Sequence, residues 1–122
     1  MLVNLEINKE NLRKNLEKIR SINKNIICVI KDNAYGLGIK NILPILLENN
    51  CNYFAVAYSD EAVKIREILK NFEKEKKLKF LENRKIKIMA LNYIKPKKLE
   101  YAIENDVELT IFNFSQLSDY LK

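Results

Sequence analysis

The sequence predicts an α/β fold, a parallel sheet of about four βα units. Four short apolar runs are rich in β-branched or aromatic residues, as strands are, and amphipathic helical patterns separate them. Strands that alternate with helices are joined by crossover connections, which make neighbouring strands parallel. The four predicted strands are residues 26–30, 53–58, 86–91 and 107–112.

The amino-terminal segment carries two patterns. Residues 2–7 alternate apolar and polar side chains, which predicts an additional half-buried strand. Asn8 can then cap a helix over residues 9–22, because apolar residues recur there at three- and four-residue steps. This helix is predicted to bury one apolar stripe.

Proline and serine residues indicate where the later helices begin. Pro44 is tolerated only in a first turn, so the second helix is expected to start at residues 41–43. Ser59 is expected to cap the third helix, and Pro96 to take the first position of the fourth. Ser115 is expected to open a short last helix.

The composition limits the chemistry that this chain can perform. Its 122 residues are 48% hydrophobic, which is enough for a single globular core. Histidine is absent, so Ser-His and Cys-His nucleophile pairs and most zinc ligand sets are excluded, and no metal site is predicted. Cys28 and Cys51 are predicted to be buried free thiols. Together with the lack of a signal-peptide pattern, they favour a cytoplasmic location.

The chain is basic, with 22 Lys and Arg against 16 Asp and Glu and a net charge of +6. Much of the excess lies in residues 70–85, which mix Lys with Glu and are expected to form a solvated helical extension or a loop. This stretch has little aromatic interleaving and no nucleic-acid-binding motif. Neither nucleic acid nor a membrane is therefore expected as a partner, and a binder of anionic surfaces is the weakest interpretation.

The segment after the first predicted strand contains both glycines of the chain. Glycine lets a backbone approach a ligand closely, and α/β folds bind ligands at the carboxyl ends of their strands. Burying an unpaired ammonium group is costly and favours the neutral amine, which can attack a carbonyl. A lysine at a strand end more often extends to solvent, so Lys31 alone leaves both interpretations open. The segment reads Lys31-Asp32-Asn33-Ala34-Tyr35-Gly36-Leu37-Gly38.

This segment resembles the cofactor-lysine signature of alanine racemases and related fold-type III pyridoxal-phosphate enzymes. The signature is an apolar strand, Lys, a variable residue, Asn or Asp, Ala-Tyr-Gly, one residue and Gly. Further segments also resemble that family: residues 3–20, residues 54–57 with 60–62 and Arg66, and residues 109–112. Leu37 is a departure, because the family usually has His there.

The resemblance implies a function for two of these residues. Lys31 is expected to bind pyridoxal 5′-phosphate as a Schiff base, and Tyr35 to donate a hydrogen bond to the cofactor phosphate. The implied activity is an amino-acid racemase that interconverts L- and D-alanine, with Lys31 as the catalytic base on one face of the substrate. The alternative is a non-catalytic pyridoxal-phosphate-binding barrel protein, although Ala-Tyr-Gly favours the racemase.

The same resemblance sets an expectation for domain organisation. The family's catalytic domain is a (β/α)₈ barrel, which needs roughly 250 residues, followed by a β-rich domain. Residues 1–122 are therefore expected to form the N-terminal half of such a barrel, as a fragment inactive by itself. Uncovered apolar strand edges favour pairing with other chains, so a homodimer or larger assembly is expected.

Overall fold

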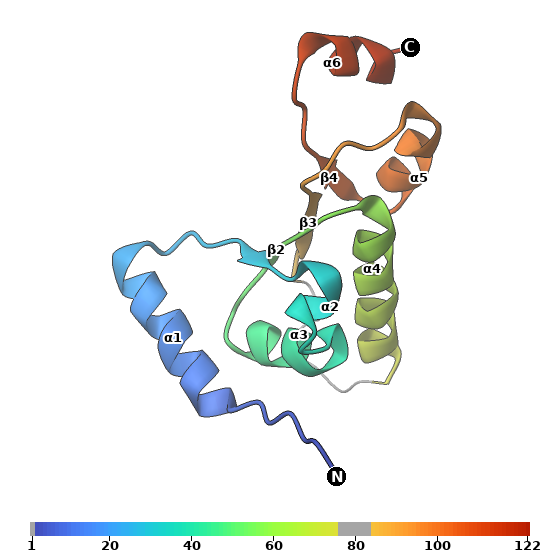
Figure 1. Cartoon of the computed structure of the whole chain (residues 1–122). Coiled ribbons are helices and arrows are strands. Elements are labelled where there is room, and N and C mark those ends of the chain that lie inside the picture. Colours follow the sequence, from blue (N-terminus) through green and yellow to red (C-terminus); the bar gives the residue numbers. More distant parts are fainter. Residues whose placement is uncertain (1, 76–83) are drawn as a thin grey trace.

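A computed structural model describes residues 2–75 and 84–122 of the chain. Its centre is a four-stranded sheet in the order β1-β2-β3-β4, and every neighbouring pair is parallel (Figure 1). This confirms the predicted α/β class with four parallel strand units. The strands are shorter than predicted: β1 (Cys28–Val29), β2 (Tyr53–Val56), β3 (Lys87–Ala90) and β4 (Val107–Leu109).

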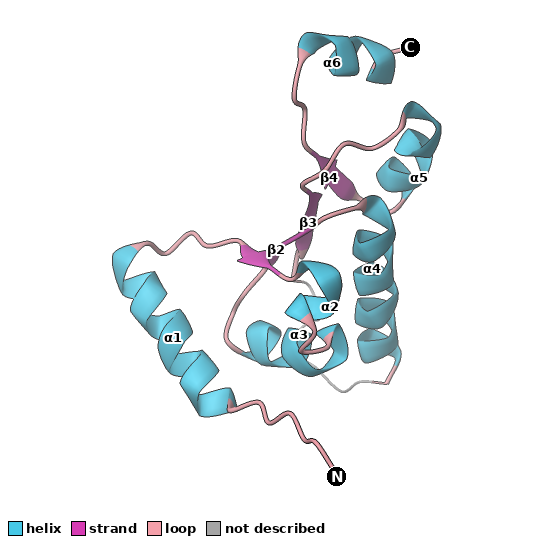
Figure 2. Ribbon diagram, in the orientation of Figure 1, coloured by secondary structure: helices cyan, strands magenta, loops and turns pink. Residues whose placement is uncertain are grey.

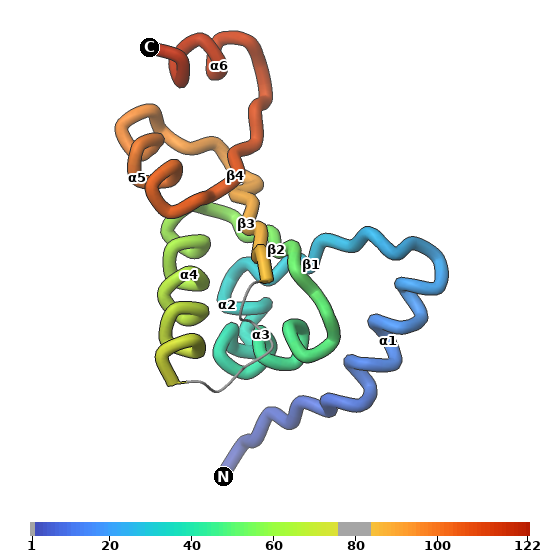
Figure 3. Tube along the Cα trace, turned by 180° about the vertical axis from the view of Figure 1, so that it is seen from behind, coloured from blue at the N-terminus to red at the C-terminus, as the bar shows by residue number. Residues whose placement is uncertain are grey.

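Helices follow the strands in the predicted alternation (Figure 2). α1 precedes the sheet, and α6 extends beyond β4 at the opposite end of the molecule, as the view from behind also shows (Figure 3). A 3₁₀ turn, η2, leads directly into α5. The helical elements are α1 (Lys9–Ile22), α2 (Lys31–Tyr35), α3 (Ile39–Glu48), α4 (Ser59–Lys74), η2 (Pro96–Lys98), α5 (Leu99–Glu104) and α6 (Phe114–Tyr120).

The hydrophobic core lies between one face of the sheet and the helices. Phe54 of β2 and Ile88 of β3 are fully buried there, against Leu43 and Leu47 of α3 and Ile65 of α4. Because side chains alternate along a strand, the next residue of each strand points to the other side of the sheet. That second face is lined by Val29, Tyr53, Ala55, Lys87, Met89 and Glu108.

The second face carries a polar cluster. The Tyr53 hydroxyl donates a hydrogen bond to the Glu108 carboxylate, and the Lys87 ammonium lies 5.2 Å from the centre of the Tyr53 ring. Lys87 Nζ is also 3.9 Å from Glu108 Oε1. The Glu108 carboxylate raises the pKa of Tyr53, chiefly through their hydrogen bond and with further contributions from desolvation and charge. Strands β2, β3 and β4 are thus linked by side chains as well as by their backbones.

Arg66 of α4 ties the amino-terminal ends of two strands together. Its guanidinium donates to the carbonyl oxygens of Ile86 at 2.9 Å, Asn105 at 3.2 Å and Asp106 at 2.8 Å. Burial lowers the pKa of Arg66, and the Asp106 carboxylate partly offsets this. The planar guanidinium group presents several N–H donors in fixed directions, which suits three carbonyl oxygens as acceptors. Arg66 therefore fixes how β3 and β4 enter the sheet.

Helix α3 begins earlier than predicted. It starts at Ile39, so Pro44 lies in the second turn instead of the first. The first turn forms because the Asn33 side chain accepts a hydrogen bond from the Ile39 amide at 2.9 Å, and the Gly38 carbonyl accepts from Asn41 and Ile42 at 3.0 Å each. The hydrogen bond from the Ile39 amide to Asn33 thus stabilises a helix that begins at Ile39, although this start places Pro44 inside the helix, where proline is disfavoured.

Two predicted caps are displaced by one residue. Ser59 is the first helical residue of α4 and Tyr58 is its N-cap, whose backbone amide donates to the Glu61 carboxylate at 3.2 Å. Helix α6 begins at Phe114 instead of Ser115, and Asn113 caps it by accepting from the Gln116 amide at 2.8 Å. Pro96 opens its 3₁₀ turn at the predicted position.

The predicted extra strand over residues 2–7 is wrong. The segment is extended but forms no strand, and Leu2, Val3 and Leu5 are exposed. An isolated strand requires a partner to satisfy its amide groups, and none of the four described strands pairs with it.

Of the Lys- and Glu-rich stretch, residues 70–74 continue α4, as predicted, and residues 76–83 lie outside the described residues. No helix in the described ranges is both long and apolar enough to span a bilayer.

Candidate functional site

The candidate site begins where β1 ends. The Ile30 amide donates to the Ala55 carbonyl at 2.9 Å, which extends the pairing between β1 and β2 by one residue. Lys31 follows directly and is half-buried. It is the first residue of α2, because the chain leaves the extended conformation at Ile30, whose ψ is 31°. The lysine therefore emerges at the carboxyl edge of the sheet, where α/β folds place their ligands.

The Glu61 carboxylate of α4 holds the backbone on both sides of this edge. Its Oε2 accepts the Asp32 amide at 2.7 Å. Its Oε1 accepts the Ala57 amide at 2.9 Å and the Tyr58 amide at 3.2 Å. Hydrogen bonds to an ionised acceptor are among the stronger ones in proteins. One side chain therefore joins the residue after Lys31 to the junction between β2 and α4.

The chain after Lys31 forms a left-handed turn, α2. Asp32, Asn33, Ala34 and Tyr35 have φ angles of 52°, 55°, 55° and 55°. In this region each L-residue costs roughly 1–2 kcal/mol. The turn was not predicted, because no residue within it is a glycine. Such strain accumulates at functional sites and persists only where surrounding contacts enforce it.

Backbone hydrogen bonds enforce the left-handed turn. The Ala34 amide donates to the Ile30 carbonyl and the Gly36 amide to the Asp32 carbonyl, both at 3.1 Å. The Gly38 amide donates to the Asn33 carbonyl at 2.9 Å. The glycines close the turn with φ angles of 86° at Gly36 and 92° at Gly38, a conformation that suits glycine. The sequence therefore places glycine at the two positions where the loop turns into α3.

The two predicted site residues occupy different environments. Lys31 is half-buried, and its ammonium makes no hydrogen bond or ion pair within residues 2–75 and 84–122. The Tyr35 side chain is 62% exposed, and its hydroxyl likewise has no partner among the described residues. The structure places both on α2 without joining them by a direct contact. Both polar atoms remain available to a ligand.

A cavity of about 250 Å³ lies at the same edge of the sheet. Tyr58 and Asp60 line it after β2, and Tyr93 and Lys98 line it after β3. Lys98 Nζ lies 2.9 Å from Asp60 Oδ2, so one positive and one negative group already neutralise each other there. Within the described part of the chain, no group of three or more His, Cys, Asp or Glu side chains is placed to hold a metal ion.

Comparison with protein families gives one decisive match. The model of the alanine racemase N-terminal domain matches residues 7–122.

The chain belongs to the alanine racemase N-terminal domain family.

Curated relatives in this family match about half of the chain. The chain is 46% identical over 65 residues to an alanine racemase of Fusobacterium nucleatum subsp. nucleatum, which is 52% of this chain and 18% of that protein. It is 39% identical over 72 residues to an alanine racemase of Rickettsia prowazekii, which is 57% of this chain and 18% of that protein. Each match thus spans less than a fifth of the relative's length.

Solved structures extend the likeness to nearly the whole chain. An alanine racemase of Clostridium difficile 630 superposes with a TM-score of 0.71 at 25% identity, over 98% of this chain and 30% of that one. An alanine racemase of Oenococcus oeni gives a TM-score of 0.74 at 22% identity, over 94% and 30%. A histidine racemase of Leuconostoc mesenteroides subsp. sake gives 0.72 at 19%, over 92% and 27%. The four-unit sheet is therefore the fold of the N-terminal part of these barrels.

Sequence reasoning missed the part that Glu61 plays at this site. Glu61 belongs to a segment that resembles the family, but the sequence indicates no contact between it and Asp32, which lies 29 residues away. A carboxylate three positions into a predicted helix does signal a capping role. Only the pairing of β1 with β2, however, brings Asp32 within its reach.

Proposed function

We propose that this chain supplies the N-terminal half-barrel, with the cofactor lysine, of a pyridoxal-phosphate-dependent amino-acid racemase of the alanine racemase type. The observation that carries the proposal is the position of Lys31. It stands half-buried at the carboxyl end of β1, and contacts from Ala55 and Glu61 fix the backbone on either side of it. Its amine has no ionic partner in the described ranges. A lysine held in this way is suited to act as a nucleophile toward a carbonyl.

The residues present fit pyridoxal phosphate. Lys31 Nζ would hold the cofactor through its aldehyde, and the exposed Tyr35 hydroxyl would donate a hydrogen bond to the phosphate. The enforced left-handed turn keeps both residues on one short, rigid segment. When bound, pyridoxal phosphate supplies an electron sink that makes the α-proton of an amino acid more acidic.

Lys31 also carries the proton transfer that this chain contributes. With the cofactor in place, Lys31 Nζ would accept or return the α-proton on one face of the substrate carbon. Inversion requires a second proton carrier on the opposite face, and neither Tyr35 nor Glu61 is assigned that task. The chain by itself is therefore proposed to exchange an α-proton without completing racemisation.

The amino acid that the site accepts is proposed from sequence likeness. Two curated relatives that are 39% and 46% identical to parts of this chain carry the name alanine racemase, which favours alanine. The fold alone does not distinguish substrates, because a histidine racemase shares it. The alternative, a non-catalytic pyridoxal-phosphate-binding barrel protein, predicts cofactor binding at Lys31 without proton exchange.

Cofactor attachment is tested by adding pyridoxal phosphate, reducing with borohydride and mapping the labelled peptide. We expect one cofactor per chain on the peptide that contains Lys31 and none in Lys31→Arg. The matched control is Lys40→Arg, which alters an exposed lysine of α3 and is expected to label normally. Labelling spread over exposed lysines, or undiminished in Lys31→Arg, contradicts the assignment.

Proton transfer is tested separately by incubating the cofactor-loaded chain with each enantiomer of alanine in deuterated water. A racemase half-site replaces the α-proton of one enantiomer by deuterium with retention of configuration. A non-catalytic cofactor-binding protein leaves both enantiomers unlabelled although cofactor remains bound. This outcome would select the alternative function.

A further inference from the structure

The amino-terminal edge of the sheet, opposite to the candidate site, holds a cavity of about 370 Å³. Arg20 of α1 and Lys24 just beyond that helix line it on one side. Asn25, before β1, and Asn50 and Asn52, before β2, line it on the other. A volume of this size is typical of sites for small ligands.

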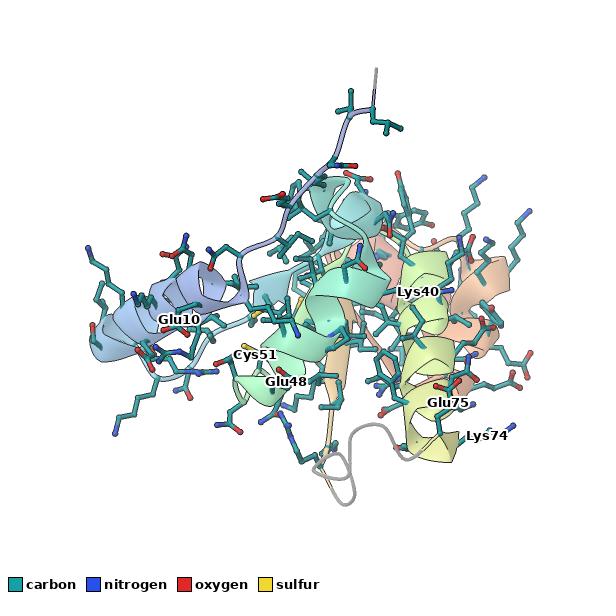
Figure 4. All side chains as sticks on the ribbon, turned by 90° about the horizontal axis from the view of Figure 1, so that it is seen from below. Glu10, Lys40, Glu48, Cys51, Lys74 and Glu75 are labelled. Carbon is teal, nitrogen blue, oxygen red and sulfur yellow. The ribbon has the colours of Figure 1, made fainter. Side chains whose placement is uncertain are left out.

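Arg20 is half-buried at this edge, and its Nη2 lies 3.4 Å from Cys51 Sγ. Figure 4 shows Cys51 beyond the end of α3, on the side that faces α1. Cys51 is a buried free thiol, as predicted, whereas Cys28 is free but only half-buried. A thiol sulfur is a weak acceptor, and Arg20 has no other partner in the described part of the chain. Most N–H groups of its guanidinium therefore lack an acceptor there.

The charged side chains that line this cavity are both positive. Neither Arg20 nor Lys24 forms an ion pair within residues 2–75 and 84–122. Other cavities contain a carboxylate beside their basic groups: Asp60 pairs with Lys98 in one, and Glu73 lines another. Removing a positive group from water without a counter-charge costs free energy. An anionic ligand would supply the counter-charge.

The helix ends near the cavity do not pair with Arg20. The last carbonyl groups of a helix carry partial negative charge, but backbone amides already occupy them here. The Asn23 amide donates to the Ile19 carbonyl of α1 at 3.0 Å, and the Cys51 amide donates to the Leu46 carbonyl of α3 at 2.9 Å. Arg20 therefore does not serve as a cap for either helix.

Asparagine side chains add neutral donors around the two cations. Asn52 Oδ1 accepts from Arg84 Nε at 2.9 Å, which leaves the Asn52 Nδ2 group without an acceptor among the described residues. The side-chain amides of Asn25 and Asn50 likewise donate to no group that the structure describes. The cavity thus presents N–H donors from several directions, an arrangement that suits an anion with several oxygen acceptors.

We propose that this cavity binds a phosphate group, either inorganic phosphate or the phosphate of a small monoester, with Arg20 as its main ligand. The N–H groups of Arg20 that are not directed at Cys51 donate to phosphate oxygens, and the Lys24 ammonium adds a point charge. A phosphate dianion neutralises two positive groups, whereas a carboxylate neutralises one. Bound phosphate connects α1 to the segment that enters β2 and so stabilises their packing.

This phosphate site is separate from the proposed cofactor site. Lys31 follows β1 at the carboxyl edge of the sheet, whereas Asn25 and Asn52 precede β1 and β2 at the amino edge. The inference does not rest on the proposed function, because it uses neither Lys31 nor pyridoxal phosphate. Its test can therefore fail while the racemase assignment stands.

The direct test is an NMR titration of the whole chain with inorganic phosphate, at mildly alkaline pH and at an ionic strength held constant with sodium chloride. We expect saturable shifts of the Arg20 Nε–H group and of the amides of residues 50–53, and weaker binding of acetate. Tighter binding of methyl phosphate would identify a monoester as the ligand, and otherwise the ligand is inorganic phosphate. No saturable shift, equal binding of acetate, or shifts confined to Gly36 and Gly38 of the cofactor loop would overturn the proposal.

Variants of Arg20 test its part in binding. Arg20→Gln is expected to weaken phosphate binding roughly ten- to hundredfold, the factor that one hydrogen bond between charged groups carries. Arg20→Lys is expected to retain part of the affinity, because it keeps the charge and loses the planar fork. The NMR spectra of the same samples show whether each variant is folded.

Two further variants separate a site from the effect of net charge. Lys18→Gln is the matched control, because it removes one positive charge from an exposed position on the opposite side of α1 from Arg20, and it is expected to leave the affinity unchanged. Lys24→Gln alters an exposed side chain and is expected to weaken binding about two- to fivefold, which keeps the test available if Arg20→Gln does not fold. Equal losses in Lys18→Gln and Arg20→Gln, or in Lys18→Gln and Lys24→Gln, would contradict the proposed site.

Discussion

The Asp32 amide donates a hydrogen bond to Glu61 Oε2 at 2.7 Å, so that a side chain of α4 holds the first residue after Lys31. The other oxygen of the same carboxylate holds the Ala57 and Tyr58 amides at the end of β2. The candidate site is thus anchored by the strand unit next to its own. A change in α4 can therefore act on Lys31 without touching it.

Removing this anchor is expected to destabilise the chain and loosen the segment around Lys31. Glu61→Ala leaves three amides without their acceptor, and a lost hydrogen bond to a charged group costs about 1.5–3 kcal/mol. Urea unfolding measures the free energy, and hydrogen exchange of the Asp32 amide measures the local effect. Glu67→Gln changes an exposed carboxylate of α4 and is expected to alter neither quantity. Unchanged exchange at Asp32 in Glu61→Ala would refute the anchoring role.

The two glycines are expected to differ in their tolerance of alanine. Both have positive φ, so alanine costs roughly 1–2 kcal/mol at either position. A Cβ at Gly36 meets no heavy atom within 4 Å, whereas at Gly38 it lies 2.8 Å from Asn41 Nδ2. Gly38→Ala must also displace Asn41, which donates to the Leu37 carbonyl at 3.1 Å. We therefore expect a lower free energy of unfolding for Gly38→Ala than for Gly36→Ala.

Thermal or urea unfolding of the two glycine variants checks this order. Asn41→Ala, made alone and together with Gly38→Ala, separates the two contributions. In the double variant the added methyl group no longer meets the amide, so the combined loss is expected to be smaller than the sum of the single losses. Strict additivity would show that the contact with Asn41 does not matter.

Alkaline pH is expected to weaken the polar cluster on the second face. The pKa of Tyr53 is raised by its hydrogen bond to Glu108, so the folded-state value lies above the value of an unfolded tyrosine, about 10. A group of this kind stabilises the fold fully below its unfolded pKa, and that contribution is lost as the pH rises through the folded pKa. Absorbance titration of tyrosinate is expected to show one tyrosine that ionises late.

Variants assign the late titration to this pair. Tyr53→Phe is expected to remove the late step, and Glu108→Gln to move it toward lower pH because the neutral amide no longer opposes tyrosinate formation. Glu104→Gln neutralises an exposed carboxylate of α5 and is expected to leave the titration unchanged. Persistence of the late step in Tyr53→Phe would place it on another residue.

Self-association is expected at the end of the chain that carries β4 and α6. Phe112 is 58% exposed and Phe114 is 90% exposed, and both line an apolar cavity of about 240 Å³ with Leu117. Exposed apolar surface of this kind marks interaction sites. Sedimentation or light scattering is expected to show mass that rises with concentration toward a dimer or a larger assembly.

Substitution at this surface tests the association. Phe114→Ser is expected to weaken it, whereas Ile103→Ser, which removes an exposed apolar side chain of α5, is expected to leave it unchanged. A chain that stays monomeric at high concentration contradicts the expectation of a homodimer or larger assembly.

Sequence patterns correctly predicted those elements that interactions between neighbouring residues determine. Helix α1 has its predicted bounds because Asn8 lies directly before it and accepts the Asn11 amide at 2.9 Å. The alternation of four apolar runs with helices is sufficient to predict the parallel order. The motif located Lys31 and Tyr35 on one loop, and its assignment of their roles stays a prediction.

Features that depend on distant contacts could not be predicted. The left-handed turn contradicts the ordinary preference of Asp32 and Ala34 and requires hydrogen bonds that exist only in the folded loop. The early start of α3 depends on Asn33, which reaches Ile39 only because that turn has formed. Residues 2–7 alternate like a strand, but alternation does not supply a partner.

The sequential order β1-β2-β3-β4 has a consequence for how the protein is made. Each new strand pairs with the one synthesised just before it, so no strand has to wait for a distant segment to leave the ribosome. Domains commonly fold as units during synthesis, and contacts of low sequence separation form fastest. A nascent chain can therefore assemble this sheet one βα unit at a time, with the strand that leads to Lys31 in place first.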